Sequence, residues 1–542
     1  MRKITIALLL ATAVSAGAQT AYDAASIASK DLNGTARFVG MGGAMGALGG
    51  DLSTMGVNPA GIGIYRSNDA AFTLGYTTNS AQSNYLGTTT TAGKNRWNVE
   101  QAGIVFSTKI GNVTPLRYVN FGFNYTRSNS LYKNMTMEGL MGTFNGAYVS
   151  QVRQMAQQAT DAAQNVYNHY GEYLDFGSNN IFSDDAAGWL GALGYQGWLI
   201  DEDTHTYPYN SYNPIVPNEA YARFHSRERG GVDQYDFNMA FNVKDRFYFG
   251  FTVGVYSANY EKYASYDETY ESAAGYDNEG YRLNTENRIK GEGWNIKLGA
   301  IVRPLESSPL RIGLAVHTPT FYRLTYSTNA LLMSDVLLDG ATTTTPIDVD
   351  TYVTLGNRNM DRDFSLETPW LFNASLGYTV GSSLALGAEY EYEDYSTLKF
   401  RYPEGDKMEQ ETNQAARNLQ GVHTLRVGAE YKPVSSFALR VGYNYSTALH
   451  RNDAVKVLPI NSLNTDTDFT NTKEMNTYTL GIGYRGSSFY ADLAYKYQTY
   501  SSDFYPFYNE FAEGNGIALV TPQATKVNTS KSQVSLTVGV RF

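Results

Sequence analysis

The sequence GMGGAMGALGGDLSTMGVNPAGIG, residues 40–63, combines closely spaced glycines with one Asn58-Pro59-Ala60 triplet. Glycine lets the backbone pack closely and adopt positive φ angles. Pro59 fixes its own φ angle and disfavours helix at Asn58. Methionine, leucine and valine stand among the glycines, which is untypical of a flexible linker. The stretch therefore predicts a compact plug of turns and short helical pieces that needs an enclosing structure.

The chain after this plug alternates apolar residues with polar or very small ones, as strands with one apolar face do. Fourteen segments show the pattern, at residues 72–76, 104–106, 119–125, 235–243, 247–255, 294–302, 310–316, 372–378, 384–390, 425–431, 437–443, 478–484, 489–495 and 534–542. The alternation alone fits either a soluble sandwich or a membrane barrel, because only the direction of the apolar face differs between them.

The connections between these segments alternate between short and long. Short turns lie near residues 111–115, 244–245, 306–307, 381–382, 433–435 and 486–487, and long connections at 80–96, 129–230, 262–291, 330–362, 397–420, 451–473 and 501–528. Outer-membrane barrels have short periplasmic turns and long outer loops. The pattern predicts an all-β fold, a transmembrane antiparallel β-barrel of about 14 strands whose lumen holds the plug.

The N-terminus indicates export. Arg2 and Lys3 precede an apolar run at residues 4–14, and Ala16-Gly17-Ala18 fits the small-residue rule for signal cleavage, so we expect the mature chain to begin at Gln19. The predicted organisation is a signal peptide at 1–18, a hatch at 19–68 and a barrel at 69–542 whose largest outer loop is 129–230. The C-terminal Phe542 after alternating residues is typical of a signal for the barrel-assembly machinery.

Composition excludes several functional classes. The 542 residues include 44 tyrosines and no cysteine, and the net charge is −10. Absence of cysteine excludes a disulfide scaffold and a thiol nucleophile. The acidic charge argues against nucleic-acid binding, which needs a basic face. We find no catalytic constellation, no metal-ligand spacing among the histidines and no sign of a cofactor, so the chain is predicted not to be an enzyme.

Residues 34–65 (GTARFVGMGGAMGALGGDLSTMGVNPAGIGIY) resemble the N-terminal hatch of the FadL/TodX family of outer-membrane transporters, whose hatch carries the motif formed here by Asn58, Pro59, Ala60 and Gly61. A looser resemblance covers residues 309–326 and 368–396. The resemblance implies passive uptake of long-chain fatty acids or other hydrophobic molecules across the outer-membrane bilayer. It further implies capture by outer loops, a lumenal pocket and release past a shifted hatch. A wall opening is conceivable at Gly122, which marks either a bulge or a close-packed glycine.

Two groups of side chains are candidates for ligand contact. In the largest loop, residues 148–168 predict a helix, and an apolar cluster follows that forms either a small core or an exposed capture groove. Its members are Trp189, Leu190, Leu193, Trp198 and Leu199. Cations on the lumenal faces of strands are candidate contacts for a ligand carboxylate. They are Lys297, Arg311, Arg426 and Arg440, and the lumenal acids Glu389, Glu391 and Glu393 are expected to face some of them.

Other functions remain open at this level. Haem uptake would draw on His169, His205 and His225 in the largest loop. A structural or adhesive outer-membrane barrel would be favoured by a lumen filled with side chains. A lipase would need a Ser–His pair at the lumen rim, which the sequence does not show. The acidic runs at 184–185 and 201–203 indicate either a calcium site or a solvated face.

Overall fold

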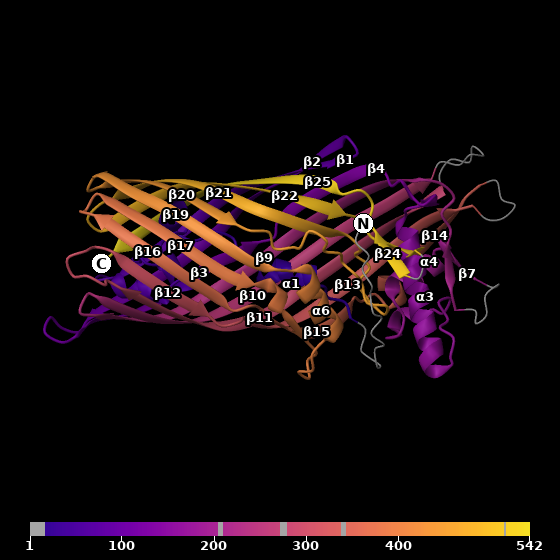
Figure 1. Cartoon of the computed structure of the whole chain (residues 1–542), viewed down its shortest axis with the longest axis horizontal. Coiled ribbons are helices and arrows are strands. Elements are labelled where there is room, and N and C mark those ends of the chain that lie inside the picture. The colour runs from indigo at the N-terminus through magenta and orange to yellow at the C-terminus, as the bar shows by residue number, and fades with distance from the viewer. Residues whose placement is uncertain (1–16, 204–209, 271–278, 338–342, 514–515) are drawn as a thin grey trace.

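Fourteen strands close into one antiparallel barrel in the computed structural model, which describes residues 17–203, 210–270, 279–337, 343–513 and 516–542 (Figure 1). The strands, in order around the barrel, are β1 (Asp69–Tyr85), β2 (Thr88–Lys109), β3 (Leu116–Ser130), β9 (Ala220–Val243), β10 (Phe247–Tyr270), β11 (Glu279–Val302), β12 (Arg311–His317), β16 (Leu371–Val380), β17 (Leu384–Asp394), β19 (Gly421–Val434), β20 (Phe437–Ser446), β21 (Phe469–Arg485), β22 (Phe489–Tyr505) and β25 (Thr525–Arg541). Strand β25 pairs with β1 from Arg541 opposite Asp69 onwards, which closes the barrel. Each predicted segment coincides with one of these strands. The predicted signal peptide lies outside the described residues except for Gly17 and Ala18, and its cleavage stays a prediction.

The predicted short turns are all present, but several predicted long loops are strand. Residues 80–96 belong to the β1–β2 hairpin, which turns at Leu86 and Gly87, and most of 262–291 belongs to β10 and β11. Further strands extend the wall at the same end: β4 (Lys133–Leu140), β13 (Phe321–Val336), β14 (Thr345–Asp350), β15 (Met360–Glu367) and β18 (Lys399–Arg401). These extensions have polar outer faces, so they lack the apolar alternation by which the spanning segments were identified.

The apolar face of the barrel points outward. Leu480 is 58% exposed and Leu314 is 60% exposed, whereas the alternating positions Thr479, Lys297 and Asp492 are buried on the inside. This is the arrangement of a membrane barrel, in which lipid covers the apolar face and the lumen is polar. Among the described residues, no helix combines the length and apolar character that crossing a membrane requires.

A compact domain covers the end of the barrel opposite Phe542 (Figure 1). It is built mainly on α3 (Gln151–Tyr170) and α4 (Trp189–Gln196). Ser150 caps the start of α3, and Gly171 ends it in the left-handed conformation at φ 69°. The predicted helix at 148–168 is therefore confirmed. The smaller elements of this end are β5 (Thr143–Phe144), β6 (Ala147–Tyr148), η3 (Ile181–Ser183), β7 (Ile200–Glu202), β8 (Tyr212–Pro214), α5 (Thr351–Thr354), η4 (Tyr395–Thr397), α6 (Glu409–Asn418), β23 (Asn509–Glu513) and β24 (Gly516–Val520).

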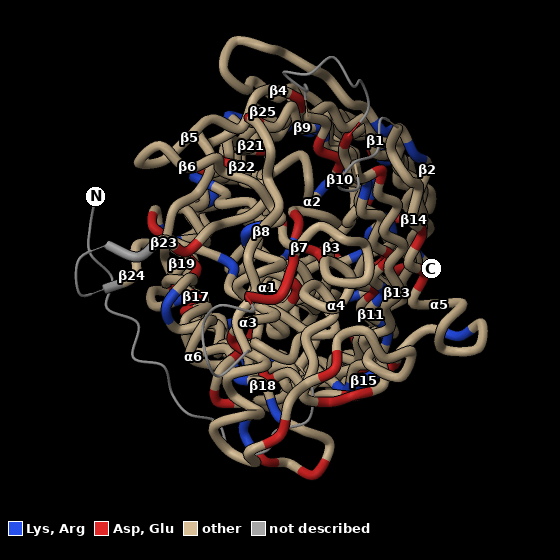
Figure 2. The backbone as a smooth tube through the Cα atoms, turned by 90° about the vertical axis from the view of Figure 1, so that its right-hand side faces the viewer, with Lys and Arg blue, Asp and Glu red and all other residues tan. Residues whose placement is uncertain are grey.

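The segment before β1 folds inside the barrel. It contains α1 (Ala21–Ala28), α2 (Ala36–Gly40) and two short 3₁₀ helices, η1 (Leu52–Gly56) and η2 (Pro59–Ile64). Viewed from the end that carries α3, helices α1 and α2 lie within the outline of the strands (Figure 2). Residues 17–68, called the hatch below, are thus packed against the lumenal wall.

The outward apolar face yields a test of the membrane setting. We expect Leu480→Arg, at the middle of the apolar belt, to destabilise the barrel in a bilayer by about 2–4 kcal/mol, because a cation there contacts hydrocarbon. The matched control is Thr78→Arg, at an exposed outward position above the belt, where a cost of about 0–1 kcal/mol is expected. Urea unfolding from lipid vesicles measures both values, and equal costs at the two positions would contradict the assignment.

Candidate functional site

The hatch is held in a compact shape by glycines in the left-handed region and by one capped turn. Gly42, Gly43, Gly49 and Gly50 have φ angles of 64°, 83°, 59° and 66°, which glycine adopts without strain. The Asn58 side-chain oxygen accepts a hydrogen bond from the Ala60 backbone N–H at 3.2 Å and caps η2. The Asn58 amide nitrogen points to the carbonyl oxygen of Ala300 on β11 at 3.5 Å. The motif therefore joins the hatch to the wall.

Glycines of the barrel wall allow the hatch backbone to pack directly against it. Gly387, Gly428 and Gly442 lie side by side on β17, β19 and β20. A side chain at Gly428 would overlap the carbonyl oxygen of Met41, and one at Gly387 would overlap that of Ala44. The same close approach recurs on neighbouring strands, at Gly250 against Pro59, at Gly299 against Asn58 and at Gly442 against Gly42. We call Gly250, Gly299, Gly387, Gly428 and Gly442 the glycine band.

Gly122 on β3 follows the same rule. A side chain there would overlap the Met55 methyl group of the hatch, and the β2–β3 register runs through Val105 and Gly122 without a shift. Gly122 is therefore a close-packed glycine and not a bulge. The register shifts of β3 lie elsewhere, next to Leu116 and Arg127 on its β9 side.

Polar contacts fasten the hatch between the glycines. The Arg37 guanidinium pairs with Glu430 of β19 at 3.0 Å. The Gly46 N–H donates to Glu389 of β17 at 2.9 Å, and the Lys496 ammonium donates to the Leu32 carbonyl at 2.6 Å. Each of these groups would be costly to bury without a partner. The wall thus fixes the position of the hatch through both shape complementarity and hydrogen bonding.

The predicted lumenal cations are engaged with protein partners. Lys297 pairs with Asp236 at 2.6 Å. Arg440 pairs with Glu430 at 2.7 Å and with Asp492 at 2.6 Å. Both side chains are thus paired inside the wall, and neither lines the lumenal cavity described below. Their contact with a ligand carboxylate stays a prediction.

The other two predicted cations differ from each other. Arg311 donates to the Leu48 carbonyl of the hatch at 2.8 Å and also lies away from the cavity. Arg426 lines the cavity and holds Glu389 at 2.6 Å and Glu391 at 2.9 Å. The expected pairing of lumenal acids with a neighbouring cation is confirmed for these two glutamates, while Glu393 pairs with Lys30 of the hatch at 2.9 Å. Of the four predicted cations, Arg426 is the one that lines this cavity.

A cavity of about 340 Å³ lies above the hatch, on the side of the outer loops. Helix α1 and the residues after it form one wall, and strands β17 to β22 form another. Charged side chains contribute much of the lining: Asp23, Lys30, Asp31, Lys133, Glu228, Lys262, Glu391, Glu393, Arg426, Lys456, Asp466, Asp468, Lys473 and Lys531. Apolar surface comes from Leu449, Phe469 and Met475 and from tyrosine rings such as Tyr22. The cavity is therefore amphipathic.

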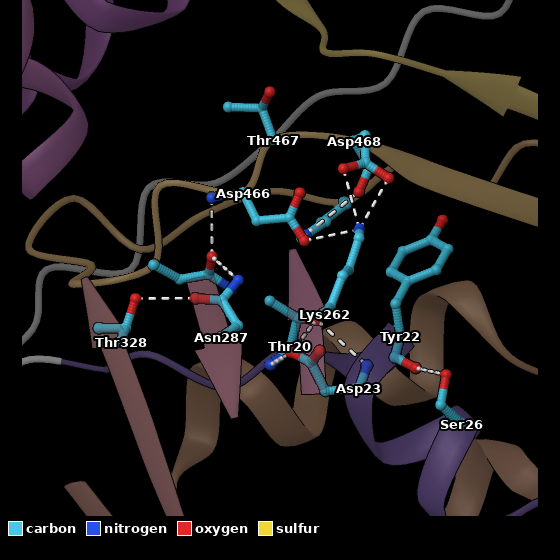
Figure 3. A network of polar contacts seen from close by, with 12 residues as sticks. Thr20, Tyr22, Asp23, Ser26, Lys262, Asn287, Thr328, Asp466, Thr467 and Asp468 are labelled. Carbon is cyan, nitrogen blue, oxygen red and sulfur yellow. Dashed lines mark hydrogen bonds and ion pairs between the residues drawn. The ribbon is translucent and has the colours of Figure 1, made fainter. Parts of the chain in front are cut away.

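The segment between β20 and β21, residues 447–468, folds back into the barrel mouth and covers this cavity. Its His450 ring stacks on Tyr22 of α1 with centroids 5.0 Å apart, and its Asp466 and Asp468 hold the Lys262 ammonium of β10 at 2.7 and 2.8 Å (Figure 3). In the same segment, the Ser462 carbonyl accepts a hydrogen bond from the backbone N–H of Trp189 of α4, at 2.9 Å. It thus connects the outer domain to the hatch.

Burial shifts the pKa values of this segment. It lowers the pKa of His450 to about 4, so the imidazole is neutral at physiological pH. Burial opposes ionisation of Asp466, but Lys262 and Lys456 outweigh it and hold the pKa of Asp466 below its ordinary value. Burial and the Asp466 carboxylate together raise the pKa of Asp468. Both carboxylates contact Lys262, and its ammonium in turn favours their ionised forms.

The apolar cluster of the outer domain is a core. Trp189, Leu190, Leu193 and Leu199 are buried, and the Trp189 indole donates to the Phe182 carbonyl at 3.0 Å. Only Trp198 is open to solvent, at 48% exposure and with a φ of 56°. The small-core interpretation accounts for the four buried residues. Capture of a ligand by this cluster stays a prediction, and Trp198 is the member placed to make first contact.

The remaining polar candidates do not converge. Asp185 pairs with Arg362 at 2.6 Å, His169 ends α3 and His225 lies on β9, while His205 falls outside the described residues. In the described ranges, no group of three or more acidic or histidine side chains could hold a metal ion.

The glycine band yields a second prediction. We expect Gly428→Val to unseat the hatch, because the new side chain overlaps the Met41 carbonyl, and so to admit small polar solutes. Swelling of vesicles in a small sugar measures the leak. The control is Gly93→Val, where a new Cβ would lie 3.6 Å from its nearest neighbour. Heat-dependent gel migration verifies that both barrels are closed, and tight vesicles with the first variant would refute the role of the band.

Comparison with known proteins agrees with this architecture. A protein-family model described as outer membrane protein transport protein (OMPP1/FadL/TodX) matches residues 217–502. No curated protein matches the chain. A crystal structure of a Pseudomonas aeruginosa FadL homologue has a TM-score of 0.52 at 15% identity and covers 95% of this chain and 100% of its own. The P. putida toluene transporter TodX has a TM-score of 0.46 at 12% identity, with 94% and 99% covered. The chain belongs to the OMPP1/FadL/TodX family of outer-membrane transport proteins, which are channels for hydrophobic compounds and not enzymes.

Proposed function

We propose that this channel takes up amphiphilic molecules passively, those with an apolar tail and a polar head, and that long-chain fatty acids are the first class to test. Membership of the family supplies the coarser statement, a channel for hydrophobic compounds. The observation that supports an amphiphilic substrate is the lining of the cavity above the hatch, which combines charged and apolar side chains.

A plain hydrocarbon fits this lining poorly. Filling the cavity with it would remove water from Lys30, Glu393, Arg426 and the neighbouring charged groups without replacing its hydrogen bonds, which is costly. A carboxylate or hydroxyl head at the Arg426 side would replace those bonds. An apolar tail would then lie against Phe469 and Met475. The volume of about 340 Å³ is at the lower end of the range for small-molecule sites.

The route has three proposed steps. Trp198 and the outer domain make first contact with the ligand. The segment 447–468 must then move aside before the ligand can reach the cavity, because this segment lies across the barrel mouth. Release past the hatch needs the hatch backbone to leave the glycine band, since the two are in contact. A purely structural barrel is disfavoured because the lumen is not filled above the hatch.

Uptake assays test the proposal. Cells without a channel of their own receive wild-type protein, Asn58→Ala or an empty vector, and uptake of labelled oleate, toluene and a small sugar is measured. We expect oleate uptake with wild type alone to exceed the vector clearly, and toluene and sugar to stay near the vector level. Loss of the Asn58 cap destabilises η2 by about 1 kcal/mol, so we expect the hatch to lose the defined shape that guides the ligand during release and oleate uptake to slow.

Asn476→Ala is the matched control for this experiment. Asn476 lies on the outer face of β21, where it accepts a hydrogen bond from Tyr443, so its removal should leave uptake unchanged. Equal oleate uptake with protein and with vector would overturn the transport proposal. Toluene uptake at or above that of oleate would overturn the proposal that the substrate is an amphiphile. It would indicate a channel for hydrocarbons instead.

A further inference from the structure

The outer face of strands β9 to β13 changes character sharply at the edge of the apolar belt. Trp294 of β11 and Phe321 of β13 are 50% and 40% exposed and form the boundary, with ring centroids 5.3 Å apart. Tryptophan and other aromatics mark the level where hydrocarbon gives way to lipid headgroups. Beyond this pair, toward the outer loops, the outward positions become charged.

Three exposed cations stand just above that boundary: Arg229 on β9, Lys290 on β11 and Arg323 on β13. Arg323 is two residues beyond Phe321 and Lys290 is four beyond Trp294, while the register places Arg229 level with Arg288, six residues beyond Trp294. These offsets are about 7, 13 and 20 Å along the strands. Within the described ranges none of the three forms an ion pair. Their neighbours do, since Arg288 pairs with Glu261 at 3.2 Å and contacts Glu286 at 3.8 Å.

The register brings these cations together on one face. Arg323 is opposite Glu292, two residues before Trp294, and Lys290 is opposite Thr325, so Arg323 and Lys290 are diagonal neighbours. Arg229 is opposite Glu261 on β10, and Glu261 is opposite Arg288. Strands lie about 4.8 Å apart, so Arg229 and Lys290 are on strands about 10 Å apart. Arg229 and Arg323 are three strand spacings apart, about 14 Å across the strands.

The opposite side of the barrel lacks this feature. Above Tyr478 and Tyr497, the next outward positions are Tyr445, Asn476, Thr499 and Ser530, all uncharged. The exposed cations further out on that side, Lys473 and Lys526, both pair with Asp503, at 3.1 and 2.6 Å. The chain as a whole has a net charge of −10, so a group of exposed cations that form no ion pair within the described ranges is not a consequence of composition. It marks a preferred contact with anions at headgroup depth.

We propose that Arg229, Lys290 and Arg323 form a docking face for the phosphorylated glycolipid of the outer leaflet. The patch is on the half of the barrel with the outer domain, opposite the short turns, and therefore faces the outer leaflet. Lipid A presents its phosphates at this level, beside acyl chains that would contact Trp294 and Phe321. Arginine and lysine are the side chains that bind phosphate. This contact is independent of transport.

Native mass spectrometry of the detergent-solubilised full chain tests the proposal. Bisphosphorylated lipid A and chemically dephosphorylated lipid A serve as probes, so that phosphate recognition is separated from general lipid contact. We expect wild type to prefer the phosphorylated form. In Arg229→Gln/Lys290→Gln/Arg323→Gln, affinity for that form should fall by about 100-fold, since each basic residue near an anionic surface contributes about fivefold.

The matched control removes three exposed cations at the short-turn end, with Arg66→Gln/Lys109→Gln/Lys244→Gln, and should bind lipid A as wild type does. Heat-dependent gel migration verifies that each variant forms a closed barrel. Equal binding of both lipid A forms by wild type would overturn the proposal. So would undiminished binding by the first triple variant, or an equal loss in both triple variants. Capture of a protein at this face in place of lipid A would also refute it.

Discussion

Close backbone contact between the hatch and the barrel is the constraint on which the rest of the structure depends. At Gly387, Gly428 and Gly442 a single Cβ would collide with hatch backbone atoms, so the wall accepts the hatch only where side chains are missing. That contact places Asn58 beside β11 and Arg37 beside Glu430. It also leaves space for a cavity above the hatch, under the segment 447–468.

The lumen combines buried ion pairs with small apolar clusters between hatch and wall, such as Met55 and Ile62 against Val105. Lys297 with Asp236, and Arg440 with Glu430 and Asp492, are buried pairs whose separation would leave an uncompensated charge. Such pairs contribute specificity of arrangement more than net stability. Apolar stabilisation comes from the outer face, through lipid, from the clusters between hatch and wall, and from the core of the outer domain around Trp189. The inside is therefore free to combine a fixed seat for the hatch with an amphipathic cavity.

The strands and short turns were predictable because residues such as Leu480 and Thr479 alternate wherever lipid touches the wall. The strand extensions at 80–96 and 262–291 were not, since water contacts their outer faces and removes the alternation. The glycine band left a visible signal, a glycine at the lumenal positions of several strands such as Gly387 and Gly428, but its meaning needs the hatch beside it. The partners of Lys297 and Arg440 come from distant strands, and no local pattern specifies them.

A disulfide between hatch and wall tests most directly whether the hatch must leave its seat for transport. A Cβ at Gly46 would lie 3.2 Å from the Ser375 Cβ of β16, close to the separation of about 3.5–4.5 Å in disulfides, and the chain has no other cysteine. Gly46→Cys/Ser375→Cys is assayed for labelled oleate uptake in oxidised and reduced form, beside each single variant. The account predicts that oxidation blocks uptake in the double variant alone and that reduction restores it. Undiminished uptake with the disulfide fully formed would contradict it.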